Sequence, residues 1–382
     1  MRLFDMLSRI VEAEIFKLAY RLQGYKLSYG TVTEVNPVLL KLTDQDGHVG
    51  WGEANAQQPF TDESPDDVFA VLRDELLPIV LDSSSSEAIV IDGQLDQFRP
   101  TDHFMAKGAI SMALLDLEGR RSGVRVADLL GGAIRTSLQV SHPLNNGSFK
   151  DDVALIDSKL EEGYVDYMLK MGTSPIPDEI ERVAALKKRY GDRVRFKADP
   201  NAGWTLEQSL EFLEGVQDSQ LAFVEQPISK NDIDGMAEIT RSTKLPISVD
   251  ESLTGMARAQ EIIQKRAATV FSIKSSKNGG PLRAKALSEL ARENGIDCYF
   301  NSMIEGGITQ AASLHHAVTA PNILNIGHGF RSTLRIEGDV TDFSTYIRNA
   351  VVQLPDRPGL GVQVDEGSVR AKNLASHLVR RL

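Results

Sequence analysis

The spacing of apolar residues divides the chain into two regions with different patterns. In the first region, β-rich runs predict three strands, at 9–18, 38–42 and 49–53. A hairpin turn at Asp46-Gly47 joins the second strand to the third. Two amphipathic helices follow, one opened by Ser64-Pro65 and one around 110–117. We therefore expect about the first 130 residues to form an α+β domain.

From residue 138 onward, short apolar runs alternate with helical patterns. The runs predict eight strands, at 138–141, 167–171, 194–198, 222–224, 247–249, 270–273, 298–300 and 323–326. Eight strands that alternate with helices are typical of a parallel TIM-type barrel. After residue 326 the pattern becomes irregular, and we expect this tail to fold back onto the first domain. The predicted division is an α+β domain at 1–132, a barrel at 133–350 and a returning segment at 351–382.

Composition limits the partners. The 382 residues include 53 Asp and Glu against 42 Lys and Arg, which gives a net charge of -11. Because there is no Lys/Arg block, we expect no nucleic-acid and no membrane partner, and small molecules are the expected ligands. Charged residues interrupt any signal-peptide core near the start, and the lone Cys298 can form no internal disulfide. These features predict a cytoplasmic protein, which we also expect to be a homo-oligomer.

Three acidic residues, Asp199, Glu225 and Asp250, follow consecutive predicted strands. Their spacings of 26 and 25 residues each match one strand-plus-helix unit, so all three should meet at the C-terminal face of the barrel. Converging carboxylates repel one another unless a cation lies between them, and oxygen ligands favour a hard ion. The sequence therefore predicts a divalent-metal site, with Mg²⁺ as the expected ion and Mn²⁺ as the alternative.

Two lysines, Lys170 and Lys274, end the predicted strands on either side of this triad. Strands two and six lie on opposite sides of a closed barrel, so the two ammonium groups can face each other across a substrate. Lowering a lysine pKa from near 10.4 to ~7 requires roughly 4 to 5 kcal/mol, which burial, the cation and the other lysine can supply. Any one of the five residues alone is more often a helix cap or a surface charge, but five in register point to a site.

Several short segments around these residues resemble motifs of a known protein family. They are Asp-Pro-Asn at 199–201, Glu-Gln-Pro at 225–227, Asp-Glu-Ser at 250–252, Lys-Ser-Ser-Lys-Asn-Gly-Gly-Pro at 274–281, Gly-Trp-Gly-Glu at 50–53 and Ala-Asp-Leu-Leu-Gly-Gly at 127–132. Together they resemble the enolase superfamily, and specifically its muconate-lactonizing-enzyme branch. The resemblance covers nearly the whole chain.

The resemblance implies an α/β fold, a modified (β/α)7β TIM-type barrel under an N-terminal α+β capping domain. It also implies that Mg²⁺ binds a substrate carboxylate, acidifies the α-proton and holds the resulting enolate. Carried over by position, the residues implied to act are the metal ligands Asp199, Glu225 and Asp250 and the proton-exchanging lysines Lys170 and Lys274.

Two further residues, Asn201 and Glu305, match family positions near the substrate. A turn residue and a helix-entry charge explain them about as well. In this architecture, loops of the capping domain at 20–30 and 55–60 are expected to close over the barrel mouth. The aromatic residues that they offer to a substrate are Tyr25, Tyr29 and Phe60.

One departure from the family pattern lies on the second barrel strand. The family usually has Lys-x-Lys there, whereas this chain has Met168-Leu169-Lys170. Met168 should point into the barrel beside Lys170 and removes a positive charge from the site. The mandelate-racemase branch fits less well, because its His-Asp pair has no counterpart here. His142 and His328 follow predicted strands, but we assign neither of them a role.

The expected function is a Mg²⁺-dependent isomerase that acts on a small carboxylate, with cycloisomerisation as the first hypothesis. Racemisation or epimerisation of an amino-acid derivative is an alternative, because two opposed lysines are its direct requirement. The Asp-x-Asp of dipeptide epimerases is absent, since the chain reads Gly327-His328-Gly329. Syn dehydration is a third possibility with the same residues. A metal-binding barrel without activity is the hypothesis from another class; Met168 mildly favours it, and the two lysines disfavour it.

Overall fold

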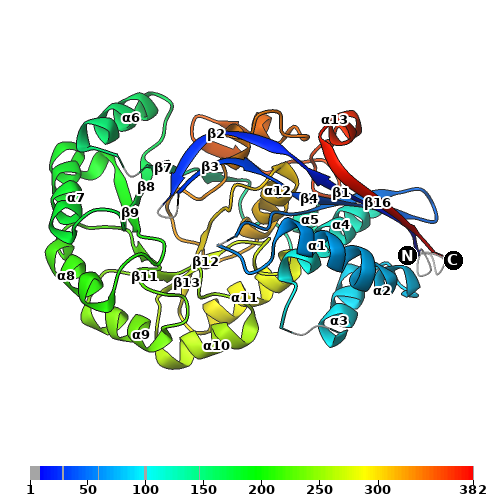
Figure 1. Ribbon diagram of the computed structural model, residues 1–382, viewed down its shortest axis with the longest axis horizontal. Coiled ribbons are helices and arrows are strands. Elements are labelled where there is room, and N and C mark those ends of the chain that lie inside the picture. Colours follow the sequence, from blue (N-terminus) through cyan, green and yellow to red (C-terminus); the bar gives the residue numbers. More distant parts are fainter. Residues whose placement is uncertain (1–8, 28–29, 59, 99–100, 146, 382) are drawn as a thin grey trace.

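The computed structural model describes residues 9–27, 30–58, 60–98, 101–145 and 147–381. Figure 1 shows a ring of strands and helices from the middle of the chain, coloured green to yellow, beside a smaller body built from both chain ends. Among the described residues, none of the helices combines the length and the apolar composition that a membrane span requires.

The smaller body, which we call the cap, is built on an antiparallel sheet in the order β16-β1-β4-β5. The predicted strands are confirmed as β1 (Ile10–Leu18), β4 (Val38–Asp44) and β5 (Val49–Ala54). β16 (Asn373–Arg380) pairs antiparallel with β1, which places the end of the chain on the cap. The domain limits at 132 and 350 stay predictions.

A second hairpin of the cap reaches over the barrel (Figure 1). It consists of β2 (Tyr20–Leu27) and β3 (Gly30–Val35), which pair antiparallel. The sequence predicted a loop at 20–30, and this was wrong for the residues that form β2. The alternation of Thr31, Val32, Thr33 and Val35 on the partner strand favours extended backbone and explains the hairpin. The side chains of Tyr25 and Tyr29 lie outside the described residues.

Helices cover one face of the cap sheet. In chain order they are α1 (Pro65–Val71), the π-helix η2 (Leu72–Leu76), α2 (Leu77–Asp82), α3 (Ala88–Phe98), α4 (Phe104–Ser122) and α5 (Val126–Leu129). Ser64 caps α1 by accepting a hydrogen bond from the Asp67 amide. A Cβ on Gly52 would lie 1.8 Å from the Ala109 carbonyl oxygen of α4. The glycines of Gly-Trp-Gly-Glu therefore let α4 lie directly on β5.

The larger body is a curled sheet of seven parallel strands, in the order β13-β12-β11-β10-β9-β8-β7. Its strands are β7 (His142–Leu144), β8 (Asp166–Lys170), β9 (Arg195–Asp199), β10 (Val224–Glu225), β11 (Ile247–Val249), β12 (Val270–Ile273) and β13 (Asp297–Phe300). Its helices are α6 (Phe149–Glu161), α7 (Ile176–Tyr190), η3 (Gly191–Arg193), α8 (Leu206–Val216), α9 (Ile233–Ser242), α10 (Met256–Lys265), α11 (Pro281–Glu293) and α12 (Gly307–Ala317). The predicted fold class, a modified TIM-type barrel with a separate cap, is confirmed.

The predicted first barrel strand at 138–141 was placed too early. β6 (Ser137–Gln139) pairs instead with β15 (Val351–Gln353), which pairs with β14 (Ile347–Arg348). The returning segment supplies this antiparallel partner, so β7 becomes the first barrel strand. The irregular part of the chain after residue 326 also contains η4 (Ser332–Leu334), η5 (Phe343–Tyr346) and α13 (Glu366–Ala371).

The predicted eighth strand at 323–326 also differs. In the described residues two isolated parallel bridges form here instead, Cys298 with Ile323 inside this segment and Val140 with His328 just after it. The bridges hold the segment between β13 and the residues that precede β7, so it closes the ring. A Cβ on Gly327 would lie 2.9 Å from the Ser141 amide nitrogen, and this close approach of two backbones explains why glycine stands there.

Candidate functional site

Five charged side chains gather at the carboxyl ends of neighbouring barrel strands. Lys170, Asp199 and Glu225 are the last residues of β8, β9 and β10, and Asp250 and Lys274 directly follow β11 and β12. The three carboxylate residues are at most 1% exposed. The structure therefore brings all five residues predicted from the strand spacing to one face of the barrel.

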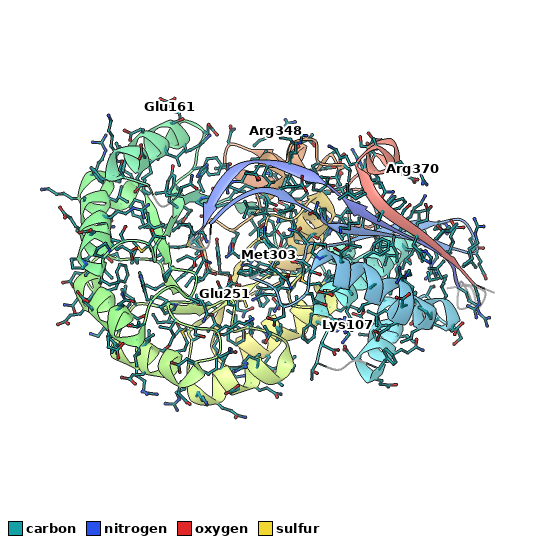
Figure 2. The ribbon with its side chains drawn as sticks, viewed as in Figure 1. Lys107, Glu161, Glu251, Met303, Arg348 and Arg370 are labelled. Atoms are coloured by element: carbon teal, nitrogen blue, oxygen red, sulfur yellow. The ribbon has the colours of Figure 1, made fainter. Side chains whose placement is uncertain are left out.

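Each lysine donates a hydrogen bond to a different carboxylate. Lys170 Nζ donates to Asp199 Oδ2, and Lys274 Nζ lies 2.5 Å from Asp250 Oδ2. Lys277, for which no role was predicted, donates to Asp250 Oδ1 at 3.0 Å. Glu251 is also buried beside this group, and Figure 2 shows it in the interior, away from peripheral residues such as Glu161 and Arg348. The motifs Lys-Ser-Ser-Lys and Asp-Glu-Ser contained both residues, but spacing alone did not separate them from loop residues.

The electrostatics of the group suit a bound cation. Burial, together with the charges of Asp199 and Asp250, raises the pKa of Glu225 to about 8. Burial, Asp250 and Asp199 likewise raise the pKa of Glu251 to about 7. Burial alone would lower the pKa of Lys274, but the carboxylates of Asp250, Glu225 and Glu251 raise it. The buried carboxylates therefore repel one another as well as attracting the lysines, and the all-oxygen donor set of Asp199, Glu225 and Asp250 fits a hard divalent ion.

A cavity of about 90 Å³ opens above these residues. Both Lys170 and Lys274 line it, and so does Asn301, whose Nδ2 donates to Glu225 Oε1 at 3.1 Å. Phe60 of the cap covers one side of the group, with its ring centroid 4.1 Å from Lys274 Nζ. A cap loop thus reaches the site, in line with the expected closure by residues 55–60.

Asn201 and Glu305 occupy different positions relative to this cavity. Asn201 Oδ1 accepts from Lys170 Nζ at 3.0 Å, and its Nδ2 donates to Glu251 Oε1 at 3.2 Å. Asn201 therefore positions the Lys170 ammonium group. Glu305 is 1% exposed and accepts hydrogen bonds from Ser276 and Ser302. Like Asn201, it is not among the described residues that line the cavity, but its partner Ser302 is, so Glu305 supports the wall from behind.

Met168, which replaces the lysine of the family pattern, lies beside a different buried lysine. Met168 lines the cavity and belongs to an interior cluster with Phe223, Val270 and Tyr299. Its register partner on β9 is Lys197, a fully buried residue that no motif in the sequence marked. Lys197 Nζ donates to Ser141 Oγ at 2.8 Å and to the Gly327 carbonyl oxygen at 2.7 Å. Burial lowers its pKa to about 8.

The two histidines that follow predicted strands have structural contacts. His328 Nδ1 accepts from the Phe300 amide at 3.1 Å, and its Nε2 lies 3.1 Å from the Leu324 carbonyl oxygen. His142 is buried, with Nδ1 2.8 Å from the Pro143 carbonyl oxygen. Neither histidine is among the described residues that line the cavity. His328 instead ties the closing segment of the barrel to β13.

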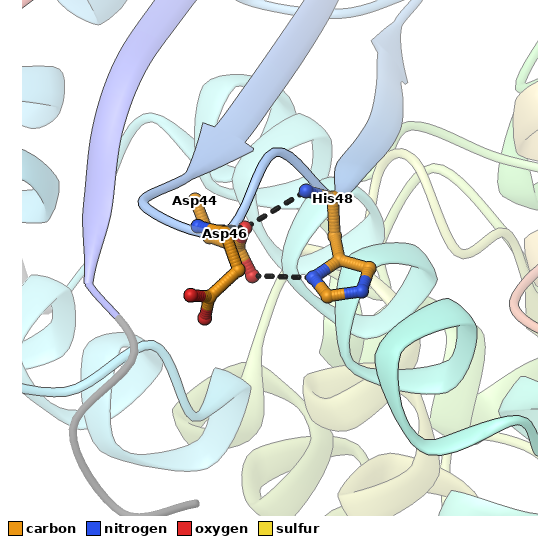
Figure 3. Close-up of side chains that lie close together, drawn as sticks. All are labelled: Asp44, Asp46 and His48. Atoms are coloured by element: carbon orange, nitrogen blue, oxygen red, sulfur yellow. Dashed lines mark hydrogen bonds and ion pairs between the residues drawn. The ribbon is translucent and has the colours of Figure 1, made fainter.

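A different group brings its potential ligand atoms within 4.8 Å of one another, namely Asp44, Asp46 and His48 in the turn between β4 and β5 (Figure 3). Asp44 Oδ1 accepts from the amides of Asp46 and His48 at 3.0 and 2.8 Å. Asp44 therefore closes the hairpin turn. Asn55, at the other end of β5, contacts the barrel through the Met303 and Ile304 carbonyl oxygens, so the turn points away from the barrel.

Comparison with known proteins agrees with this architecture. Residues 151–368 match the family model described as "Enolase C-terminal domain-like", so the barrel is that of the enolase superfamily. Residues 10–131 match the N-terminal domain of the mandelate racemase / muconate lactonizing enzyme family. The chain belongs to this family. The relatives described in the next paragraph are isomerases. Members of the superfamily generally use a divalent metal.

Three relatives illustrate the range of the family. Muconate cycloisomerase 1 of Acinetobacter baylyi is 30% identical over 348 residues, which cover 90% of this chain and 94% of that protein. L-Ala-D/L-Glu epimerase of Bacillus subtilis is 30% identical over 359 residues, which cover 93% and 96%. The crystal structure of N-succinyl Arg/Lys racemase from Bacillus cereus superposes with a TM-score of 0.92 at 26% identity, covering 97% of this chain and 100% of that one.

Proposed function

We propose that the protein is a Mg²⁺-dependent isomerase that removes the α-proton of a small carboxylate to form an enolate. One observation carries the proposal: three buried carboxylates, Asp199, Glu225 and Asp250, lie between two lysines that line one cavity. In this proposal the three carboxylates hold the divalent ion. When bound, the ion supplies positive charge beside the substrate carboxylate and so acidifies the α-proton.

The proposed roles of the lysines follow from their positions. Lys170 lies on β8 and Lys274 follows β12, four strands apart in the sheet order. Their ammonium groups therefore approach a molecule in the cavity from opposite sides. One lysine would take the α-proton as the neutral amine, and the other would donate a proton or stay charged beside the carboxylate. Asn201, which accepts from Lys170 Nζ, would keep that lysine oriented.

Cycloisomerisation is the first specific reaction that we propose, because the segments Lys-Asn-Gly-Gly-Pro at 277–281 and Glu-Gln-Pro-Ile-Ser at 225–229 resemble that branch most closely. Racemisation is the second, and the two opposed lysines favour it. The two reactions make different demands on the lysines. A racemase needs both for full turnover, whereas a cycloisomerase needs one proton donor or acceptor at the reacting carbon.

Exchange of substrate α-protons with D₂O tests the proposal. A panel of carboxylic acids, including N-acyl amino acids and dipeptides, would be incubated with the enzyme and Mg²⁺ and followed by NMR. For cis,cis-muconate, whose α-carbons are vinylic, the signal is deuterium at the α-carbon of the lactone that forms. We expect at least one acid to exchange, with a loss of about 10² or more in Lys170→Ala or Lys274→Ala. In a racemase each lysine variant should lose exchange from one enantiomer. If no acid exchanges in the wild-type enzyme, the proposed chemistry is wrong.

A further inference from the structure

The cavity at the barrel mouth is bordered by cations on more than one side. Besides Lys170 and Lys274, two arginines line it, Arg331 and Arg335. Both arginines follow the segment that closes the ring between β13 and β7. Among the described residues that line this cavity there is no Asp or Glu. The wall that the arginines form has no role in the removal of the α-proton proposed above.

The backbone turn that carries the two arginines is firmly anchored. Phe330, which precedes Arg331, is 1% exposed, and Ser332 Oγ donates to the Glu305 carbonyl oxygen at 2.6 Å. The Arg335 amide donates to the Ser332 carbonyl oxygen at 2.9 Å. The Arg331 guanidinium carbon lies 5.9 Å from the ring centroid of Tyr164. Because these contacts fix the turn, ordering the two side chains around an anion costs less entropy.

The arginines lie across the barrel mouth from the acidic residues. β10, which ends in Glu225, is the middle strand of the seven, and the closing segment lies between the two ends of that sheet. Lys170 and Lys274 end strands between these two positions. A molecule that spans the cavity would therefore have one end directed toward the side of the barrel that holds the buried carboxylates, its centre between the lysines and its other end at Arg331 and Arg335.

The surroundings of His142 agree with a positive wall. Burial, followed by the charges of Arg331, Arg335 and Lys159, lowers the pKa of His142 to about 2. His142 therefore stays neutral and adds no further charge. The sequence Gly327-His328-Gly329 also agrees with a positive wall, because it contains no acidic side chain that would hold a substrate ammonium group.

We propose that Arg331 and Arg335 bind a second anionic group of the substrate, so that this enzyme prefers small acids with two carboxylates over acids whose far end is neutral or cationic. The planar guanidinium fork matches a carboxylate with two parallel hydrogen bonds. An ammonium group at the same place would be repelled. This inference rests on the proposed function, which places the first carboxylate and the α-carbon.

Matched ligand pairs test the inference. The probes are glutarate, cis,cis-muconate and N-succinyl-L-alanine, each beside the monoamide in which the far carboxylate becomes a carboxamide of the same shape. Binding to the Mg²⁺-loaded wild-type enzyme would be measured by calorimetry, so the readout does not depend on turnover. We expect at least one diacid to bind about 10-fold or more tightly than its monoamide, the range for a hydrogen bond to a charged group. Added salt should weaken this preference.

Variants locate the preference in the arginines. The double variant Arg331→Gln/Arg335→Gln should bind diacid and monoamide alike, and Arg335→Lys should keep part of the preference. Arg348→Gln is the control, because Arg348 is exposed on β14 at the periphery (Figure 2). The inference is overturned if no diacid outbinds its monoamide, or if the double variant keeps the preference. Failure of the proposed chemistry would look different, because diacids would bind selectively while no acid exchanged its α-proton.

Discussion

Met168 on β8 and Lys197 on β9 are register partners inside the barrel, and they are 5% and 1% exposed. The chain thus places a buried cation on the third barrel strand, beside the position where the family usually has a lysine on the second. Lys197 Nζ lies 4.7 Å from the ring centroid of Tyr299, which also packs against Met168 in the interior cluster. One ammonium group already occupies the layer below Lys170.

Restoring the family pattern at this position should therefore destabilise the protein. In Met168→Lys, a second ammonium group would enter the interior beside Lys197 and lose the apolar contacts to Phe223 and Tyr299. We expect the free energy of unfolding to fall by about 2 to 5 kcal/mol. Met168→Leu, which keeps the volume, should cost less than about 1.5 kcal/mol. Urea unfolding compares the two variants, and equal stability would show that the layer accommodates a second charge.

Removal of a single proposed ligand should weaken metal binding. Asp199→Asn, Glu225→Gln and Asp250→Asn each take one negative charge from the group, and we expect Mg²⁺ affinity to fall by about 10-fold or more. Calorimetric titration with MgCl₂ measures this. Asp46→Asn in the β4–β5 turn is the matched control and should leave the affinity unchanged. The opposite pattern, loss in Asp46→Asn alone, would move the metal site to the hairpin.

The contact between β5 and α4 should tolerate no side chain at Gly52. A methyl group there would lie 1.8 Å from the Ala109 carbonyl oxygen, so α4 must shift away from the sheet in Gly52→Ala. We expect a loss of about 1 to 3 kcal/mol, the cost of overpacking. Gly93→Ala is the control, because its Cβ would meet nothing within 4 Å in α3. That change should add about 0.5 to 1 kcal/mol. Thermal unfolding distinguishes the two, and a Gly52→Ala protein as stable as wild type would contradict the close packing.

The sequence predicted the parts of the fold that depend on local pattern. Strands β4 and β11 begin at their predicted residues, because Val and Ile runs bounded by turns leave little alternative. The first barrel strand was misplaced, because the partner of β6 comes from β15, more than 200 residues further along the chain. No local pattern reports such a pairing.

The candidate site likewise contains residues that the local sequence pattern predicted and residues that it did not. The regular spacing of strands and helices was enough to predict that Asp199, Glu225 and Asp250 share one face of the barrel. Arg331 and Arg335 could not be predicted in this way, because they follow a segment that forms only two bridges and lie on an irregular turn. Their common direction depends on contacts such as that between Ser332 and Glu305, which join residues far apart in the sequence.

Two buried histidines should make the protein sensitive to acid. His315 Nδ1 accepts from the Ala127 amide at 3.0 Å, and its Nε2 lies 3.1 Å from the Leu360 carbonyl oxygen. Because Nδ1 already accepts a hydrogen bond, it cannot bind a proton without breaking that bond. His328 is held in the same manner. Burial lowers the pKa of His315 to about 4 and that of His328 to about 3.

These lowered pKa values fix the sign of the pH dependence. Between pH 6.5 and 4 the unfolded chain binds protons at these histidines and the folded chain does not, so stability is complete above pH 6.5 and falls as the pH falls. At pH 5 each histidine should cost about 2 kcal/mol relative to pH 7. His315→Gln, which can still accept and donate, should shrink the loss between pH 7 and pH 5 by about that amount in chemical denaturation. His377→Gln on the exposed strand β16 should not, and an unchanged loss in His315→Gln would mean that His315 already binds its proton in the folded state.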